Sequence, residues 1–161
     1  MNTPILSPDA VDAMRKEMEV NVFGMASMIH GFAPILAKNG GGAIVNVLSV
    51  VSWFTPPFNA TYAASKHAAL AVSDAARIEL RKQGTHVVGV YAGFIDTDMA
   101  GAVSGPRMAP AQVAARTLEG VESGLNHVLA DERARQIYDA VRRDPEQLER
   151  TQQDVWDQRK R

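Results

Sequence analysis

Apolar side chains recur every three or four residues along the first part of the chain. They fall at Val11, Met14, Met18, Val22, Met25, Ile29, Phe32 and Leu36. Since positions three and four apart share a helix face, this spacing predicts a long amphipathic helix over Asp9–Lys38, continuous or broken once. Ser7 as N-cap and Pro8 at the first helical position suit its start, and the glycines at 40–42 end it.

Two short runs of β-branched and other apolar residues come next, Ala43–Leu48 and His86–Tyr91. The first has apolar side chains on both faces, which is typical of an inner strand of a parallel sheet. Between the two runs, the alanine-rich segment Ala60–Lys82 predicts a second long helix that ends at Gly84.

The same reading continues beyond a glycine-rich loop over Ala100–Ala109. It predicts a helix from Pro110 to about Ser123, a strand over His127–Ala130 and a helix over Asp131–Val141. This alternation predicts an α/β fold, a partial Rossmann-like doubly wound parallel sheet of about three strands with flanking helices. Residues 142–161 are mostly polar and predict a polar helical or disordered tail, in which Val155 and Trp156 are the residues able to dock.

Composition narrows the class of protein. A chain of 161 residues suits one domain, and its formal charge of -1 gives no basis for binding nucleic acid or an anionic membrane. It has no cysteine, and its four histidines are scattered, so we expect neither disulfides nor a metal site. We see no apolar run of about 20 residues and no signal peptide, so we expect a cytoplasmic protein that does not bind membranes.

Candidate chemistry gathers where the predicted strands end, the edge at which open parallel sheets bind ligands. Tyr62 and Lys66 are four apart and therefore share a helix face, and Ser49 follows the first strand thirteen positions before the tyrosine. An ammonium about 4–5 Å from a phenol favours the phenolate by roughly 3–4 kcal/mol at an effective dielectric of about 20. The spacing therefore predicts that Lys66 lowers the pKa of Tyr62 and makes it a general acid or base.

Four motifs in this order resemble the short-chain dehydrogenase/reductase family. They are Val20–Gly24 with Asn21, Asn46–Ser49, Tyr62–Lys66 and Gly93–Thr97. The resemblance runs from about Leu6 to Asp131. It implies that residues 1–141 are the catalytic portion of a single Rossmann-type domain, lacking the amino-terminal glycine motif that binds dinucleotides.

The resemblance implies a role for each matched catalytic residue. Tyr62 would be the acid/base that protonates a carbonyl oxygen or deprotonates an alcohol, and Ser49 would hydrogen-bond the reacting oxygen. Lys66 would lower the pKa of Tyr62 and hold the nicotinamide ribose. Asn21 would anchor a water that links Lys66 to solvent. For Asn21 an alternative stays open, that it only ties down a neighbouring loop.

The resemblance also implies NAD or NADP as cofactor, with Tyr62, Lys66, Thr97 and the backbone of Ile95 contacting its nicotinamide end. Thr97 could instead be a helix cap. The partners implied are a small alcohol or carbonyl substrate and further copies of the chain, as a homodimer or homotetramer built on the two long helices. Five apolar residues near the strand ends could line a substrate pocket or belong to the core and subunit contacts: Trp53, Phe54, Phe58, Phe94 and Met99.

The chain departs from the family at two places. The family's phosphate-binding turn and its Asn-Asn-Ala-Gly stretch are absent, and the glycines at 40–42 lie after a helix and before a strand, the reverse of such a turn. A fragment or misannotated start is the interpretation we favour, over a natural truncation or a partner chain that supplies the missing strands. Such a chain should bind NAD(P) poorly and leave Ala43–Leu48 as an unpaired edge. The second departure is Ala92, where the family usually has proline.

Three functions compete at this point. The first is an NAD(P)-dependent oxidoreductase that interconverts an alcohol and a carbonyl by hydride transfer. The second is a nucleotide-sugar epimerase, although only 99 residues follow Tyr62, where those enzymes carry a longer substrate domain. The third is a truncated, non-catalytic interaction protein. The sequence identifies neither the substrate, nor NAD against NADP, nor the direction of the reaction.

Overall fold

The computed structural model describes residues 3–98, 105 and 107–159. The chain begins with a helical stretch in three parts, α1 (Ala10–Met18), a π-helical turn (Glu19–Gly24) and α2 (Met25–Lys38). The helix predicted over Asp9–Lys38 is therefore continuous, but widened for one turn around Asn21. Three further helices lie where the sequence predicts them, α3 (Ala60–Leu80), α4 (Pro110–Glu122) and α5 (Glu132–Arg143), and the polar tail forms α6 (Pro145–Arg159).

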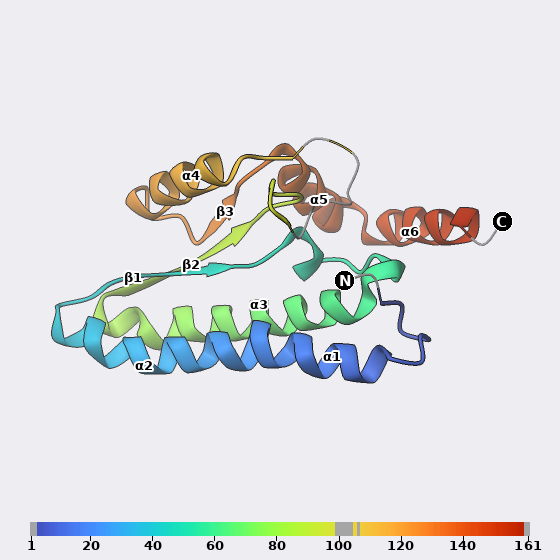
Figure 1. Ribbon diagram of the computed structural model, residues 1–161. Coiled ribbons are helices and arrows are strands. Elements are labelled where there is room, and N and C mark those ends of the chain that lie inside the picture. Colours follow the sequence, from blue (N-terminus) through green and yellow to red (C-terminus); the bar gives the residue numbers. More distant parts are fainter. Residues whose placement is uncertain (1–2, 99–104, 106, 160–161) are drawn as a thin grey trace.

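Three parallel strands form the sheet, in the order β1 (Gly42–Val47), β2 (Thr85–Tyr91) and β3 (His127–Leu129). Val47 pairs with Val90 and Tyr91 with Leu129, so all three strands end at one edge. Figure 1 shows α1 and α2 end to end below the sheet, with α3 alongside them, and α4 above the sheet. The predicted α/β class and parallel three-stranded sheet are confirmed.

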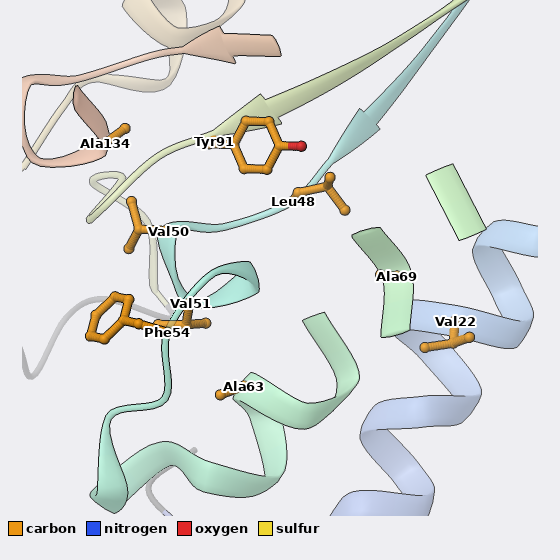
Figure 2. Close-up of a cluster of buried hydrophobic side chains, with 9 residues drawn as sticks. All are labelled: Val22, Leu48, Val50, Val51, Phe54, Ala63, Ala69, Tyr91 and Ala134. Carbon is orange, nitrogen blue, oxygen red and sulfur yellow. The ribbon is translucent and has the colours of Figure 1, made fainter. Parts of the chain in front are cut away.

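The central strand β2 is buried and divides the core in two. Side chains alternate along a strand, so Tyr91 faces α3 and α5, whereas Val88 and Val90 face α4. Figure 2 shows the first cluster, in which Tyr91 lies beside Leu48 of the segment after β1, and Ala63 and Ala69 come from α3. This packing fixes the segment after β1 against the start of α3, the two parts that carry Ser49 and Tyr62.

Strand β1 lies at the edge of the sheet, as the resemblance led us to expect, although its two apolar faces are typical of an inner strand. Among the described residues it pairs with β2 alone, and the side chains of Val45 and Val47 are 38% and 63% exposed. Its other edge borders a cavity of about 530 Å³ that lies between β1 and the α1–α2 stretch. An apolar strand with a free edge is a site where a further strand can pair.

The glycines before β1 serve the sheet rather than a phosphate. Gly41 has a φ of +114°, and a Cβ there would collide with the carbonyl of Gly84, itself left-handed at +75°. The turns that precede β1 and β2 therefore touch backbone to backbone, and the N–H of Gly42 donates to the oxygen of Gly84 at 3.2 Å. Only glycine fits such a contact.

The structure corrects the prediction for one segment, the first helical stretch, and completes it for another, the polar tail. The helical stretch Ala10–Lys38 is long and apolar enough to cross a membrane by length and composition, so the expectation that no segment reaches this limit was wrong. It was missed because small residues interrupt the apolar ones between residues 20 and 37. This segment nevertheless contains no Asp, Glu, Lys or Arg. In the tail, α6 is helical and its Trp156 stacks on Phe58, with ring centroids 4.9 Å apart.

Candidate active site

Helix α3 presents Tyr62 and Lys66 to the end of β1, one helical turn apart. The ammonium of Lys66 lies 5.7 Å from the centroid of the Tyr62 ring and donates a hydrogen bond to the carbonyl of Val47 at 3.0 Å. Lys66 is only 8% exposed. The described residues hold no carboxylate within ion-pair distance of its ammonium, so a buried cation is held here by a backbone carbonyl.

Ser49 lies at the sharp turn that follows the end of β1, across from Tyr62 on α3. Ser49 caps the short 3-10 turn Val50–Ser52: its Oγ accepts from the N–H of Val51 at 3.3 Å, and its own N–H donates to Ser52 Oγ at 3.3 Å. The hydroxyl of Ser49 is near enough to the Tyr62 phenol to act on its pKa. The structure thus brings together the three residues that the spacing predicted would meet.

Burial dominates the protonation of both groups. Burial raises the pKa of Tyr62, the Ser49 hydrogen bond lowers it in part, and the carboxylate of Glu17 raises it further. Burial likewise lowers the pKa of Lys66. The net lowering of the Tyr62 pKa predicted from the Tyr62–Lys66 spacing was therefore wrong: the phenol is more buried than a helix surface position, and the ammonium is directed at Val47.

Asn21 lies on the π-helical turn and contacts α3 directly. Its Nδ2 donates to Ser65 Oγ at 2.9 Å, and Ser65 in turn donates to the carbonyl of Tyr62 at 2.8 Å. Asn21 and Lys66 also line the same cavity beside β1. The amide therefore ties the first helical stretch to α3, and its remaining oxygen acceptor is available next to the cavity that Lys66 reaches.

The segment after β2 carries the other two candidate positions. Ile95 forms an isolated parallel bridge with Met108, and Thr97 Oγ1 donates to the carbonyl of Ile95 at 3.4 Å. Thr97 is exposed. Whether Thr97 caps a helix depends on residues 99–104, which lie outside the described part of the chain, as does Met99.

Asp131 anchors this segment, and the sequence reading assigned it no part in the site. One carboxylate oxygen accepts from the N–H of Gly93 and the other from the N–H of Ala134, both at 2.7 Å. Asp131 is thus the N-cap of α5 and the support of the loop after β2. An Asp before a predicted helix is an N-cap signal, but its second partner is 38 positions away and leaves no local trace.

Replacing Asp131 with alanine should lower the free energy of unfolding by about 2–3 kcal/mol, because it removes a helix cap and leaves the Gly93 N–H unpaired. Urea denaturation followed by circular dichroism measures this loss. Asp139→Ala, on the exposed side of α5, should change stability by less than about 0.5 kcal/mol. Equal losses in the two variants would contradict the anchoring role.

Comparison with known proteins identifies this arrangement. The model of the short chain dehydrogenase family matches residues 2–107, roughly two thirds of the chain. The chain belongs to the short-chain dehydrogenase family. The residues that meet at the end of β1 lie within the matched part.

Named relatives agree with this assignment. Dehydrogenase/reductase SDR family member 7B of Rattus norvegicus is 34% identical over 94 residues, which are 58% of this chain and 29% of the relative. NADPH-dependent 1-acyldihydroxyacetone phosphate reductase of Schizosaccharomyces pombe is 40% identical over 96 residues, 60% of this chain and 32% of that protein. The chain thus spans about three tenths of the length of these curated relatives.

Among solved structures, a short-chain dehydrogenase of Burkholderia cenocepacia in complex with NADP superimposes with a TM-score of 0.87. It is 36% identical, and the match covers 94% of this chain and 65% of that one. The match therefore extends beyond the residues that the family model covers.

Most of the apolar candidates near the strand ends serve packing. Phe54 is buried in the core, Trp53 stacks on Tyr91 with centroids 3.9 Å apart, and Phe94 lies under the guanidinium of Arg133 at 4.9 Å. Trp53 and Phe54 also border a second cavity of about 400 Å³ between the loop after Ser49 and α6. Phe58, stacked on α6, helps to hold that helix in place.

Proposed function

We propose that this chain is the catalytic portion of an NAD(P)-dependent oxidoreductase that interconverts an alcohol and a carbonyl. One observation carries the proposal: the hydroxyl of Ser49 is near enough to the phenol of Tyr62 to act on its pKa, and the buried ammonium of Lys66 lies over the same ring. A proton donor, a second hydroxyl and a fixed positive charge at one point suit stabilisation of a reacting oxygen.

In the reductive direction, Tyr62 gives its phenolic proton to the carbonyl oxygen, and the O–H bond of the phenol is replaced by the O–H bond of the alcohol. Ser49 donates a hydrogen bond to the same oxygen and keeps the carbonyl carbon in place. Alcohol oxidation is the reverse, with Tyr62 as the base. NAD(P)H, when bound, supplies the hydride that the carbonyl carbon receives.

The described residues suit the nicotinamide end of the cofactor. Lys66 spends one N–H on Val47, so two donors remain for ribose hydroxyls. The backbone of Ile95 and the hydroxyl of Thr97 stand at the end of β2, where a carboxamide would be held. Both NAD and NADP fit this end; the NADPH-dependent yeast relative and the NADP-bound bacterial structure favour NADP. The described residues contain no strand–glycine-turn–helix unit for the diphosphate.

Proton supply would use the cavity beside β1. A water bound to the free oxygen of the Asn21 amide would lie in the cavity that Lys66 also lines, and would connect its ammonium to solvent. The hydrogen bond from Asn21 to Ser65 favours this role, because it fixes the amide next to the turn of α3 that carries Lys66.

We further propose a homodimer or homotetramer in the cytoplasm, with a small-molecule substrate and neither nucleic acid nor membrane as partner. The apolar helical stretch leaves Val20, Phe23, Met28 and Phe32 about half exposed or more, beside α3. Contacts between copies would cover these side chains. A membrane-spanning role suits the stretch less well, because Asn21 and Glu17 are directed from it into the protein.

A non-catalytic interaction protein is the second candidate, and the open edge of β1 favours it. The apolar cavity of about 530 Å³ along that edge is large enough to take side chains of another segment. Under this alternative the Ser49–Tyr62–Lys66 group would remain without use.

Turnover distinguishes the two. We expect the chain alone to bind NADPH weakly. In a chimera, the part of the Burkholderia cenocepacia relative that this chain does not cover is placed before residue 3. We expect this chimera to consume NADPH with aldehydes or ketones. Absorbance of NADPH follows the reaction. A folded chimera that binds NADPH but reduces no member of a broad carbonyl panel would favour the interaction protein.

A further inference from the structure

Arg133, in the first turn of α5, is a cation that packing holds in place without an anionic partner. Its guanidinium carbon lies 4.9 Å from the centroid of the Phe94 ring. Its alkyl stem packs on Gly93, where a Cβ would come within 2.6 Å of Arg133 Cδ. Arg133 is exposed, and no carboxylate or carbonyl oxygen of the described residues accepts a hydrogen bond from its guanidinium. Its N–H donors are therefore available to a ligand.

Carboxylates on the same two segments are already engaged. Asp96 forms an ion pair with Arg107 at 3.2 Å, and Glu132 forms one with Arg135 at 3.3 Å. The aspartate that caps α5 accepts two backbone N–H groups. Arg107 and Arg135 are thus neutralised, whereas the contact that Arg133 makes is with the face of an aromatic ring, which fixes a cation but leaves its charge in place.

Gly93, which Arg133 covers, lies next to the segment that carries Ser49. Backbone pairing continues past the ends of β1 and β2, because the N–H of Val50 donates to the carbonyl of Ala92 at 3.3 Å. By the register of the two strands, Gly93 lies opposite Val50, one strand spacing of about 4.8 Å away. Arg133 therefore stands at the edge where open parallel sheets bind ligands.

Arg133 and Tyr62 also lie on the same face of the sheet. Helices α3 and α5 both contribute to the cluster that contains Tyr91. Tyr62 lies in the first turn of α3 and Arg133 in the first turn of α5, and both helices begin where the strands end. A molecule whose carbonyl oxygen lies between Ser49 and Tyr62 can therefore direct another part of itself towards the guanidinium.

We propose that Arg133 binds an anionic group, a carboxylate or a phosphate, on the substrate, and that the enzyme acts on acidic carbonyl compounds. A guanidinium binds either group through two parallel N–H···O hydrogen bonds, which orient the bound molecule as well as hold it. The contacts with Phe94 and Gly93 fix the guanidinium before the substrate arrives, so less entropy is lost on binding. The substrate class rests on the proposed function; anion binding by Arg133 does not.

Anion binding is tested in the 161-residue chain by NMR of nitrogen-15-labelled arginine side chains. Arg133→Met assigns the Nε–H signal of Arg133 by its loss. Sodium phosphate and sodium benzoate, titrated to millimolar concentrations at constant ionic strength, should shift this signal saturably. The signal of Arg143, exposed at the other end of α5, should not move. No shift at Arg133, or equal shifts of both signals, would overturn the proposal.

The substrate class is tested in the active chimera with two pairs of substrates, each differing in its anionic group. They are 4-carboxybenzaldehyde against its methyl ester, and dihydroxyacetone phosphate against dihydroxyacetone. The anionic member of at least one pair should be the better substrate. Arg133→Met retains the stem on Gly93 and should raise the KM of that member about 10- to 100-fold, the usual contribution of a charge-assisted hydrogen bond. The KM values of the neutral member and of NADPH should stay within about threefold, and Arg143→Met should change none of the three.

The responding pair distinguishes a carboxylate from a phosphate, and no preference for either anionic member would refute the proposal. A KM that rises equally for the neutral and the anionic member would show a structural role alone. A rise for NADPH alone would place the bound anion on the cofactor, and either result refutes the proposal. Arg133→Lys, which keeps the charge without the planar fork, should recover part of the loss. A chimera without turnover would count against the proposed function and leave the NMR result standing.

Discussion

Replacing Tyr62 with phenylalanine should lower kcat of the active chimera by about 10²–10⁴-fold, the usual contribution of a general acid or base. The variant retains the ring that packs in the core and lies under Lys66, and loses only the hydroxyl that lies near Ser49. The variant has no phenol beside Ser49 to give up a proton, so water would have to protonate the reacting oxygen. Initial rates with saturating NADPH measure the loss.

A second tyrosine provides the control for this result. Tyr138 on α5 also lies in an aromatic group, with its ring centroid 5.0 Å from that of Trp53, and its ring lies under the guanidinium of Arg142. Tyr138→Phe removes a hydroxyl of the same kind and should change kcat by less than about threefold. Comparable losses in both variants, or full activity of Tyr62→Phe, would show that the Tyr62 hydroxyl has no chemical part in turnover.

The fold could be predicted because its signals are local. Spacings of three and four residues placed α3, and short β-branched runs placed β1 and β2. The π-helical turn at Glu19–Gly24 could not be predicted in this way, because one additional residue in a turn leaves the apolar spacing almost unchanged. The exposure of β1 depends on which strands lie beside it, and no local pattern reports that.

The residues of the site could be predicted from the sequence, but the direction of their pKa shifts could not. The i,i+4 spacing correctly placed Tyr62 and Lys66 on one face of α3. The direction of the Tyr62 pKa depends instead on burial and on Glu17, which come from packing between segments distant in the sequence. Glu17 and Asp131 read as ordinary helix residues, and only the folded chain shows that Glu17 is buried and that Asp131 holds Gly93.

Lys66 should show opposite effects on function and on stability. Lys66→Met removes the positive charge over Tyr62 and a predicted ribose contact, and should lower kcat/KM of the chimera at least about 10²-fold. The same change should stabilise the 161-residue chain by about 1 kcal/mol at neutral pH, because it replaces a buried ammonium that has no carboxylate partner among the described residues with an apolar side chain of similar length. The carbonyl of Val47 stays near water, since that residue is 63% exposed.

The pH dependence of this gain follows from the lowered pKa of Lys66. Between the folded and the unfolded pKa, the unfolded chain binds more protons, so the stability of the unaltered protein rises with pH across that interval. Below the folded pKa the ammonium carries its full burial penalty; above about 10.5, the unfolded value, the penalty is gone. The advantage of Lys66→Met should therefore be greatest at neutral pH and should disappear towards that limit.

Chemical denaturation at several pH values measures it, with exposed Lys82→Met as the control. A Lys66→Met chain less stable than the unaltered one at neutral pH would mean that the lysine is held for structure, whereas greater stability with lost turnover would mean that its buried charge is retained for catalysis.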